Sequence, residues 1–500
     1  MIIFRKFWPA LVLSSLMGCS DSSDHHPITE PAPPEPQFLA IADATIDQAP
    51  DIGAPLDLGS FDLALVGYEE TEYFISGTAS AFTNLNELGS DGQWEVEAAE
   101  QAPYATRLLV RRPTSGADFS GTVIVEWMNV SAGFDTTPEW NNAHVEIVRS
   151  GHAWVGVTAQ FVGIYGREGG IAPFHLKAYN AERYAALEHP GDSFSYDIYS
   201  QVAQAIRAPS GLNMLEGLDI ELLLGFGESQ SASRMATYVN AIQLLYNPYD
   251  GYMIHSRGDR SSSLAQEPQV GISTPEKVSI RGDLNVPVLF FQTETDVLRE
   301  GATVGRQDAS DVFRLWEVAG TAHADYYTSV SGSFDTGIDP AYAAVIEETS
   351  VLGFIECEFP MNSGPMHYVF NAATAALDSW ARGGDAPPQG PLLQISDDFS
   401  AYAFDDLGNV LGGIRTPYVD APVAILSGKG QSGESFCFLF GTTELFSAEL
   451  MASLYTNEAG YVAAVAEAAE SAVAAGFLLQ VDADQIITWA PSQWQQQTAQ

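Results

Sequence analysis

A serine stands where an apolar run gives way to small residues with helical spacing. In the stretch LLLGFGESQSASRM, residues 222–235, the apolar run ends in Gly-Glu-Ser-Gln-Ser, with Ser229 at its centre. A serine hydroxyl is a weak nucleophile and needs an adjacent base, an orienting acid and donors for an oxyanion. The pattern Gly-x-Ser-x-small is typical of a nucleophile elbow, a tight strand-to-helix turn that exposes the serine oxygen. We therefore predict that Ser229 is a nucleophile; taken alone, the pattern also fits a serine that caps a helix.

The acid that would orient the base is expected beyond the next apolar run. In enzymes that carry such an elbow on a parallel sheet, the acid and then the histidine follow the serine along the chain. The run VPVLFFQ is followed by TETDV, which places Glu294 and Asp296 in the turn where this acid would emerge. We predict Asp296 as the acid and keep Glu294 as the alternative.

The general base is expected to be a histidine on a loop after a further strand-like run. The segment DVFRLWEVAGTAHADYY, residues 311–327, ends such a run with a loop of small residues that carries His323. This histidine would take the proton from Ser229 and return it to the leaving group. Only His367, in NSGPMHYVF, also follows the acid, and it is the alternative base or else a polar residue in the first turn of a helix over 367–380.

The donors for the oxyanion are expected from two backbone segments. One is the N–H of Gln230, directly after the nucleophile. The other would come from the end of VIVEWMNVSAG, residues 123–133, around Asn129 and Val130. Asn129 has an equally good structural interpretation as a turn former.

The charge and the motifs of the sequence argue against nucleic-acid, metal and cofactor binding. The chain has 500 residues, of which 64 are acidic and 21 basic, so its formal net charge is −43. Such a charge repels nucleic acid and anionic lipid headgroups, and we predict no nucleic-acid partner. We find neither a cluster of metal-ligating residues nor a phosphate-binding glycine loop with its lysine, and we predict no metal and no organic cofactor.

The N-terminal residues predict export. Two basic residues precede the apolar run 7–16, and the sequence LMGC then ends at Cys19. Residues 1–18 are typical of a signal peptide, and the ending resembles the bacterial lipobox, in which the cysteine becomes the lipidated first residue. The Pro- and Ser-rich residues 19–39 would then form a tether. We expect a lipid-anchored protein of the periplasm or outer membrane, or, if the signal is an ordinary one, a secreted protein.

Two further cysteines fit an exported protein. If Cys19 carries lipid, Cys357 and Cys437 remain as the single possible pair in an oxidising compartment. The bridge would close a loop of about 80 residues and contribute on the order of 4 kcal/mol by chain entropy. Two buried free thiols are the alternative.

The elements that must position these residues alternate along the chain. Short apolar runs rich in β-branched residues are separated by segments with helical spacing, which is typical of an α/β fold with a mainly parallel sheet covered on both faces. Earlier residues such as TEYFISGTASAF favour antiparallel strands before the main sheet. Beyond about residue 395 the composition changes, and 459–479 predicts a long Ala-rich helix. The runs that predict strands of the main sheet are 106–113, 121–130, 153–160, 220–227 and 286–294.

Several segments together resemble a bacterial exported family known as the alpha/beta hydrolase domain family. The resemblance implies the α/β-hydrolase fold, hydrolase activity and a site built from Ser229, Asp296 or Glu294, and His323. It also implies one domain with a core at 40–395 and a C-terminal extension, 396–500, packed on that core. The segments that carry it are 125–133, 191–207, 225–235, 290–298, 319–327, 362–370 and 408–424.

We therefore expect an exported serine hydrolase that cleaves a small-molecule or polymer-derived carboxylic ester through an acyl-enzyme. Two other functions fit the same sequence. An acyltransferase would use the same residues with an alcohol in place of water. A surface binding lipoprotein would keep the fold without the activity.

Overall fold

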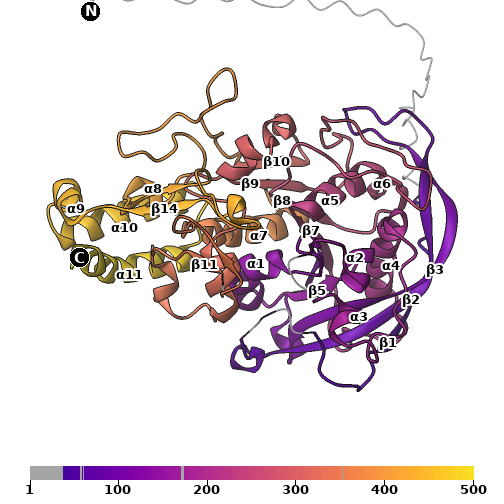
Figure 1. The fold of residues 1–500 in the computed structure, drawn as a ribbon. Helices are drawn as coiled ribbons and strands as arrows, with labels where there is room; N and C mark the ends of the chain where they lie inside the picture. The colour runs from indigo at the N-terminus through magenta and orange to yellow at the C-terminus, as the bar shows by residue number, and fades with distance from the viewer. Residues whose placement is uncertain (1–37, 57–58, 60, 171–173, 352, 500) are drawn as a thin grey trace, which may run out of the picture. The chain divides into compact units, whose positions relative to one another are not determined.

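A ten-stranded sheet forms the centre of the protein in the computed structural model (Figure 1). The described residues are 38–56, 59, 61–170, 174–351 and 353–499, and they belong to one unit that begins at Phe38. The predicted signal peptide, Cys19 and all but the last two residues of the predicted tether lie outside the described residues. The strands of the sheet, in chain order, are β1 (Thr45–Gln48), β2 (Tyr68–Asn84), β3 (Val96–Pro113), β4 (Thr122–Trp127), β5 (Ala153–Val157), β6 (Ser210–Gly211), β7 (Leu222–Glu228), β8 (Gly251–His255), β9 (Val288–Gln292) and β10 (Phe313–Glu317).

The strand order across the sheet is β10-β9-β8-β7-β4-β5-β3-β2-β1-β6. From β10 to β5 all neighbours pair in parallel, and β3, β2 and β1 continue the sheet with antiparallel pairs. The prediction of a mostly parallel α/β fold is therefore confirmed. The carboxyl ends of the parallel strands meet at one edge of the sheet, which is where open α/β sheets place their functional loops.

Helices cover both faces of the sheet, and those near the C-terminus form a group beside it (Figure 1). They are α1 (Pro138–Arg149), α2 (Phe161–Tyr165), α3 (Leu176–Tyr179), α4 (Ser195–Arg207), α5 (Gln230–Ala241), α6 (Gln243–Tyr246), α7 (Met366–Ala381), α8 (Pro417–Asp420), α9 (Ala448–Tyr455), α10 (Glu458–Ala474) and α11 (Gln480–Thr498).

Burial on both faces explains why the central strands read as continuous apolar runs. Every residue of β4 is buried, but alternate side chains enter different clusters. Val123 and Val125 pack with α4 and α5, whereas Ile124 packs with α1 and α7. Because successive strand residues point to opposite faces, a strand with two covered faces has no polar side.

The antiparallel part of the sheet is longer than the sequence suggested. The predicted strand over 106–113 is only the second half of β3, which pairs with β2 along almost its whole length, with an irregularity between Ser80 and Phe82. Part of β3 is exposed, namely residues 97–101 near its start. A hydrophobicity pattern detects the buried half of such a strand, because only that half alternates or is uniformly apolar.

The C-terminal residues build a second cluster of helices beside the sheet, with the short hairpins β11 (Ser350–Val351) with β12 (Ile355–Glu356) and β13 (Ala424–Ser427) with β14 (Thr442–Leu445). The predicted long helix is α10, which begins after Asn457, whose side chain accepts from the N–H of Gly460. Arg149 of α1 joins this region to the core through two contacts with the Asp482 carboxylate, 2.5 and 2.9 Å long. Within the described residues, no helix is long and apolar enough to cross a membrane.

Candidate active site

Ser229 lies in the sharp turn between β7 and α5. Its backbone dihedrals are φ 57° and ψ −114°, a conformation that L-residues rarely adopt, and its N–H donates to the carbonyl of His255 at 2.8 Å. The turn is also crowded, since a Cβ on Gly227 would lie 3.1 Å from the carbonyl oxygen of Ser231. These features explain the small residues on both sides of the serine, and they match the strained geometry of a nucleophile elbow.

The structure brings Ser229, His323 and Asp296 into one hydrogen-bonded chain. The Oγ of Ser229 lies 2.8 Å from Nε2 of His323, and Nδ1 of the same ring lies 2.5 Å from Oδ1 of Asp296. His323 is 6% exposed and Asp296 is fully buried. The three side chains come from the loops after β7, β10 and β9, so they meet at the carboxyl edge of the parallel sheet.

The carboxylate of Asp296 has donors on both oxygens. While Oδ1 faces His323, Oδ2 accepts from the N–H and the hydroxyl of Thr293, both at 2.7 Å, and from the hydroxyl of Ser256 at 2.8 Å. Burial by itself would raise the pKa of Asp296, but the charge of His323 and these hydrogen bonds outweigh it and hold the pKa below its usual value. Asp296 is therefore an anion at neutral pH.

Glu294, the alternative acid, has a different role. Its Oε1 accepts from the N–H of Gly320 at 2.7 Å and its Oε2 from the N–H of Gly428 at 2.8 Å. Burial raises its pKa to about 7 against the effect of these two backbone donors. Glu294 thus links the start of the His323 loop to the C-terminal region, and it is Asp296 that contacts the histidine.

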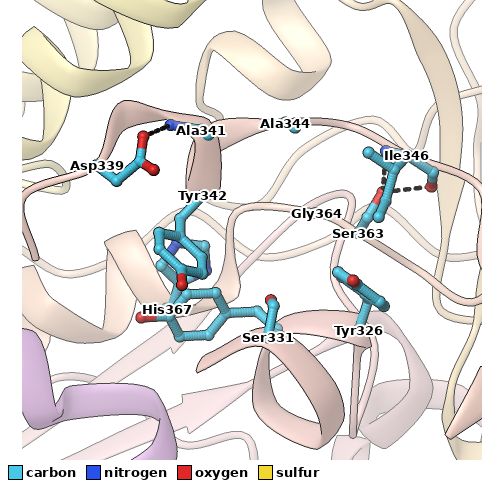
Figure 2. A pocket seen from close by; sticks show the side chains of 11 residues that line it. Tyr326, Ser331, Asp339, Ala341, Tyr342, Ala344, Ile346, Ser363, Gly364 and His367 are labelled. Carbon is cyan, nitrogen blue, oxygen red and sulfur yellow. Dashed lines mark hydrogen bonds between the residues drawn. The ribbon is translucent and has the colours of Figure 1, made fainter. Parts of the chain in front are cut away.

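His367, the alternative base, lines a cavity of about 310 Å³ (Figure 2). Its ring stacks on Tyr327 with 3.6 Å between centroids, and it lies beside Tyr342, with Tyr326 farther along the cavity. Both ring nitrogens are buried without a hydrogen-bond partner among the described residues, and burial lowers the pKa of His367 well below its usual value. Ser229 is not among the residues that line this cavity, and the structure does not bring His367 to it.

The predicted oxyanion donors separate into two groups. Gln230 is the first residue of α5, so its N–H has no partner within the helix. For the N–H of Val130 no acceptor is found among the described residues. The N–H of Asn129 donates to the carbonyl of Thr136 at 3.1 Å, and its side-chain amide donates to the backbone carbonyl and the carboxylate of Glu228, at 3.1 and 2.9 Å. Asn129 acts as a structural residue of the turn.

The family is decided by the match of a family model along most of the chain. The model described as "Alpha/beta hydrolase domain" matches residues 25–488. The chain belongs to the alpha/beta hydrolase domain family. No curated protein matches the chain.

Three solved structures resemble the chain distantly. The esterase Est22 is 12% identical, with 54% of this chain and 78% of that chain covered and a TM-score of 0.29. A fungal esterase from Rhizomucor miehei is 11% identical, with 51% and 78% covered and a TM-score of 0.25. XC6422 from Xanthomonas campestris, described as a serine hydrolase without a lid, is 12% identical, with 48% and 83% covered and a TM-score of 0.26.

A second carboxylate lies close to the ring of His323. Oε1 of Glu228, the residue before the nucleophile, lies 3.2 Å from Nε2 of His323. Burial opposes a charge on His323, but attraction to Asp296, its hydrogen bond and attraction to Glu228 prevail and raise the pKa of His323 to about 9. Sequence reasoning missed Glu228, because it occupies the position of the Gly-x-Ser-x-small pattern that accepts any residue. The signal that could have pointed to it is a carboxylate at the end of the strand, next to Ser229.

His255 and Glu139 form a buried pair next to the turn of Ser229, which sequence reasoning did not predict. Nδ1 of His255, at the end of β8, is 3.1 Å from a carboxylate oxygen of Glu139 in the first turn of α1. Burial lowers the pKa of His255 to about 4, so its imidazole is neutral at pH 7. His255 also accepts, through its carbonyl, the N–H of Ser229. Through the hydrogen bond from Ser229, the pair supports the turn that carries this serine.

A backbone hydrogen bond links the loop that carries His323 to the C-terminal part of the chain. The N–H of Ala324 donates to Leu439 at 3.2 Å, and that segment is fixed by a disulfide between Cys357 and Cys437. The disulfide joins the two cysteines that the sequence left as a pair. Within the described ranges, no group of three or more His, Cys, Asp or Glu residues is placed to hold a metal ion.

Proposed function

We propose that this chain is a serine hydrolase that cleaves carboxylic esters through an acyl-enzyme. The observation that carries the proposal is the continuous chain from Ser229 Oγ through the His323 ring to Asp296, with its nucleophile on a strained elbow. In such a chain the histidine is held in one tautomer, with Nδ1–H toward the acid and the lone pair of Nε2 toward the serine. This is the arrangement that a general base requires.

The reaction would proceed in two halves. His323 Nε2 takes the hydroxyl proton of Ser229 as the serine oxygen attacks the ester carbonyl, and it then gives that proton to the departing alcohol. A water molecule next loses a proton to the same nitrogen and attacks the acyl group, which leaves as the carboxylic acid. Throughout, the charge that forms on the imidazole is balanced by Asp296, which is already ionised.

The charge that forms on the carbonyl oxygen would be stabilised by backbone donors. One donor is the N–H of Gln230, the first residue of α5. At this end of the helix the dipole also favours a negative charge. The N–H of Val130, on the loop after β4, is the proposed second donor. Since β4 and β7 are neighbours in the sheet, their loops emerge side by side.

The proposed place of action is outside the cell membrane, with a lipid on Cys19. Support comes from the sequence of residues 1–19 alone. Labelling cells with a radioactive or clickable palmitate should mark the wild-type protein and leave Cys19→Ala unmarked. A wild-type protein that carries no lipid would contradict the anchor.

The test of the activity uses a fluorophosphonate probe on the domain that begins at Phe38. We expect mass spectrometry to find the probe on Ser229, no labelling of Ser229→Ala or His323→Ala, and hydrolysis of short p-nitrophenyl esters that falls at least about 10³-fold in both variants. Ser233→Ala, one turn further along α5, is the matched control and should behave as wild type. Well-folded protein without label or turnover would contradict the proposal, and transfer of the acyl group to an added alcohol in preference to water would make the protein an acyltransferase.

A further inference from the structure

The neighbour of the nucleophile, Glu228, lies against the nitrogen that must accept the serine proton. We propose that Glu228 is a positioning residue that competes with Ser229 for Nε2 of His323 and thereby sets the pH above which the nucleophile is active. The inference rests on the proposed function, because it gives Glu228 its role in the same Ser229 and His323 pair.

The competition follows from the hydrogen bonding of Nε2. This atom lies 2.8 Å from Ser229 Oγ and 3.2 Å from Glu228 Oε1. Without a proton, Nε2 can only accept, and the hydroxyl of Ser229 is then its partner. With a proton it can only donate, and an ionised Glu228 is the stronger acceptor because a charge-assisted hydrogen bond is favoured over a neutral one. The carboxylate therefore favours the imidazolium, in which the base is already protonated.

Glu228 is held in this position by its surroundings. It is the last residue of β7, so its backbone is fixed by the sheet, and it is only 6% exposed. The side-chain amide of Asn129 donates to Oε2 of Glu228 at 2.9 Å, which leaves Oε1 directed to the imidazole. A carboxylate fixed on both sides acts on His323 continuously, unlike a mobile surface charge.

Other charged groups around this pair have separate partners. Asp296 binds the opposite nitrogen of His323, and Glu300 acts on His323 only through its charge, from a partly exposed position. On the side of Glu228, His255 is neutral at pH 7, and burial raises the pKa of Glu139 well above its usual value, which disfavours a charge there. Burial raises the pKa of Glu228 to about 7, and attraction to His323 opposes that rise. Glu228 is thus the carboxylate that contacts the reacting nitrogen.

Two opposite effects on catalysis are expected from this contact. Between the pKa of Glu228, about 7, and that of the imidazole, about 9, the ion pair with Glu228 keeps His323 protonated and Ser229 inactive. Above the pKa of the imidazole, the same carboxylate stabilises the imidazolium that forms when Ser229 attacks, which accelerates the reaction. A residue with only a structural role would lower activity by a similar factor at every pH.

The experiment measures the second-order rate of fluorophosphonate inactivation and kcat/KM for a p-nitrophenyl ester from pH 5 to 10, in wild type and Glu228→Gln. We expect the midpoint of the rise to fall by about one pH unit or more in Glu228→Gln, the direction expected when a nearby negative charge is removed. At high pH the variant should be slower than wild type. The two profiles should cross, with the variant faster on the acid side.

Two further variants keep the test decisive. Glu139→Gln removes a buried carboxylate that contacts His255 and not His323, so its midpoint should move less than that of Glu228→Gln. Glu228→Asp keeps the charge but shortens the reach to Nε2, and its midpoint should lie between those of wild type and Glu228→Gln. The aspartate variant also replaces the glutamine variant as the test if the latter does not fold.

The outcomes separate this inference from the proposed function. If wild type is never labelled at Ser229, the proposed function fails. If Ser229 is labelled and the midpoint is the same in wild type and both Glu228 variants, or moves equally in Glu139→Gln, the function stands and the inference is overturned.

Discussion

Thr293 donates both its backbone N–H and its hydroxyl to the same carboxylate oxygen of Asp296, three residues later, with both distances at 2.7 Å. This turn at the end of β9 leaves the other oxygen of Asp296 for His323. The carboxylate of Asp296, the proposed acid, is therefore oriented by local residues of one turn. Preorganised groups of this kind need not rearrange during the reaction.

The first prediction concerns the acid of the triad. Asp296→Asn should reduce kcat/KM by about 10²- to 10⁴-fold, because the amide no longer balances the imidazolium and can hold the wrong tautomer of His323. The melting temperature serves to show that the variant is folded. Unchanged turnover in folded Asp296→Asn would remove Asp296 from the mechanism.

A second prediction assigns Glu294 to stability. Glu294→Gln should lower the free energy of unfolding by about 1–3 kcal/mol, because an amide cannot accept from both Gly320 and Gly428 and leaves a buried donor facing a donor. Urea unfolding measures this difference. Glu467→Gln, an exposed site on α10, is the control and should be unchanged. A larger loss of kcat/KM in Glu294→Gln than in Asp296→Asn would reverse the two assignments.

For His367 we expect a change in acid stability without a loss of activity. His367→Phe keeps a ring against Tyr327 and should turn over ester at close to the wild-type rate, whereas His323→Phe should be inactive. Because the pKa of His367 is lowered in the folded state, its stabilising contribution is present above pH 6.5 and is lost as the pH falls below it, by up to about 1.4 kcal/mol per pH unit. Urea unfolding at pH 6.5 and 5.5 should show a smaller loss in His367→Phe than in wild type. An equal loss would contradict this account.

A fourth prediction uses the disulfide. The two cysteines are separated by 80 residues, and a cross-link of this length stabilises the folded state by about 4 kcal/mol under the chain-entropy model. Replacing both Cys357 and Cys437 by alanine should therefore lower the melting temperature, and a reductant should destabilise wild type but not the double variant. Equal melting temperatures for wild type and double variant would show that the bridge contributes little.

Residues marked by a local sequence motif were predicted better than contacts between residues that are distant in the sequence. The elbow, the turn after VPVLFFQ and the loop before His323 each have a local sequence pattern, and the order of residues along the chain is enough to select Ser229, Asp296 and His323 as candidates. The strands of the parallel sheet were found for the same reason, since burial on both faces leaves continuous apolar runs. An exception is β8, whose five residues GYMIH contain no β-branched run and were not recognised.

The residues that surround the triad were missed because they are partners only in three dimensions. Glu139 and His255 are 116 positions apart, and no local pattern connects them. The sequence places Asn129 after the strand-like run that forms β4, but it does not show that Glu228 and Thr136 accept the hydrogen bonds of its N–H groups. The extension of β3 was missed because residues 97–101, near its start, are exposed.

The contact between Glu294 and Gly428 also has a consequence for when this protein acquires its activity. During translation, Ser229, Asp296 and His323 have all been synthesised by the time the ribosome reaches residue 323, but Gly428 and Leu439 follow about a hundred residues later. Until then Glu294 lacks the N–H of Gly428, and the His323 loop lacks the carbonyl of Leu439. A chain that stops early would carry every triad residue and still be without a finished site, so newly made protein should become active only near the end of synthesis.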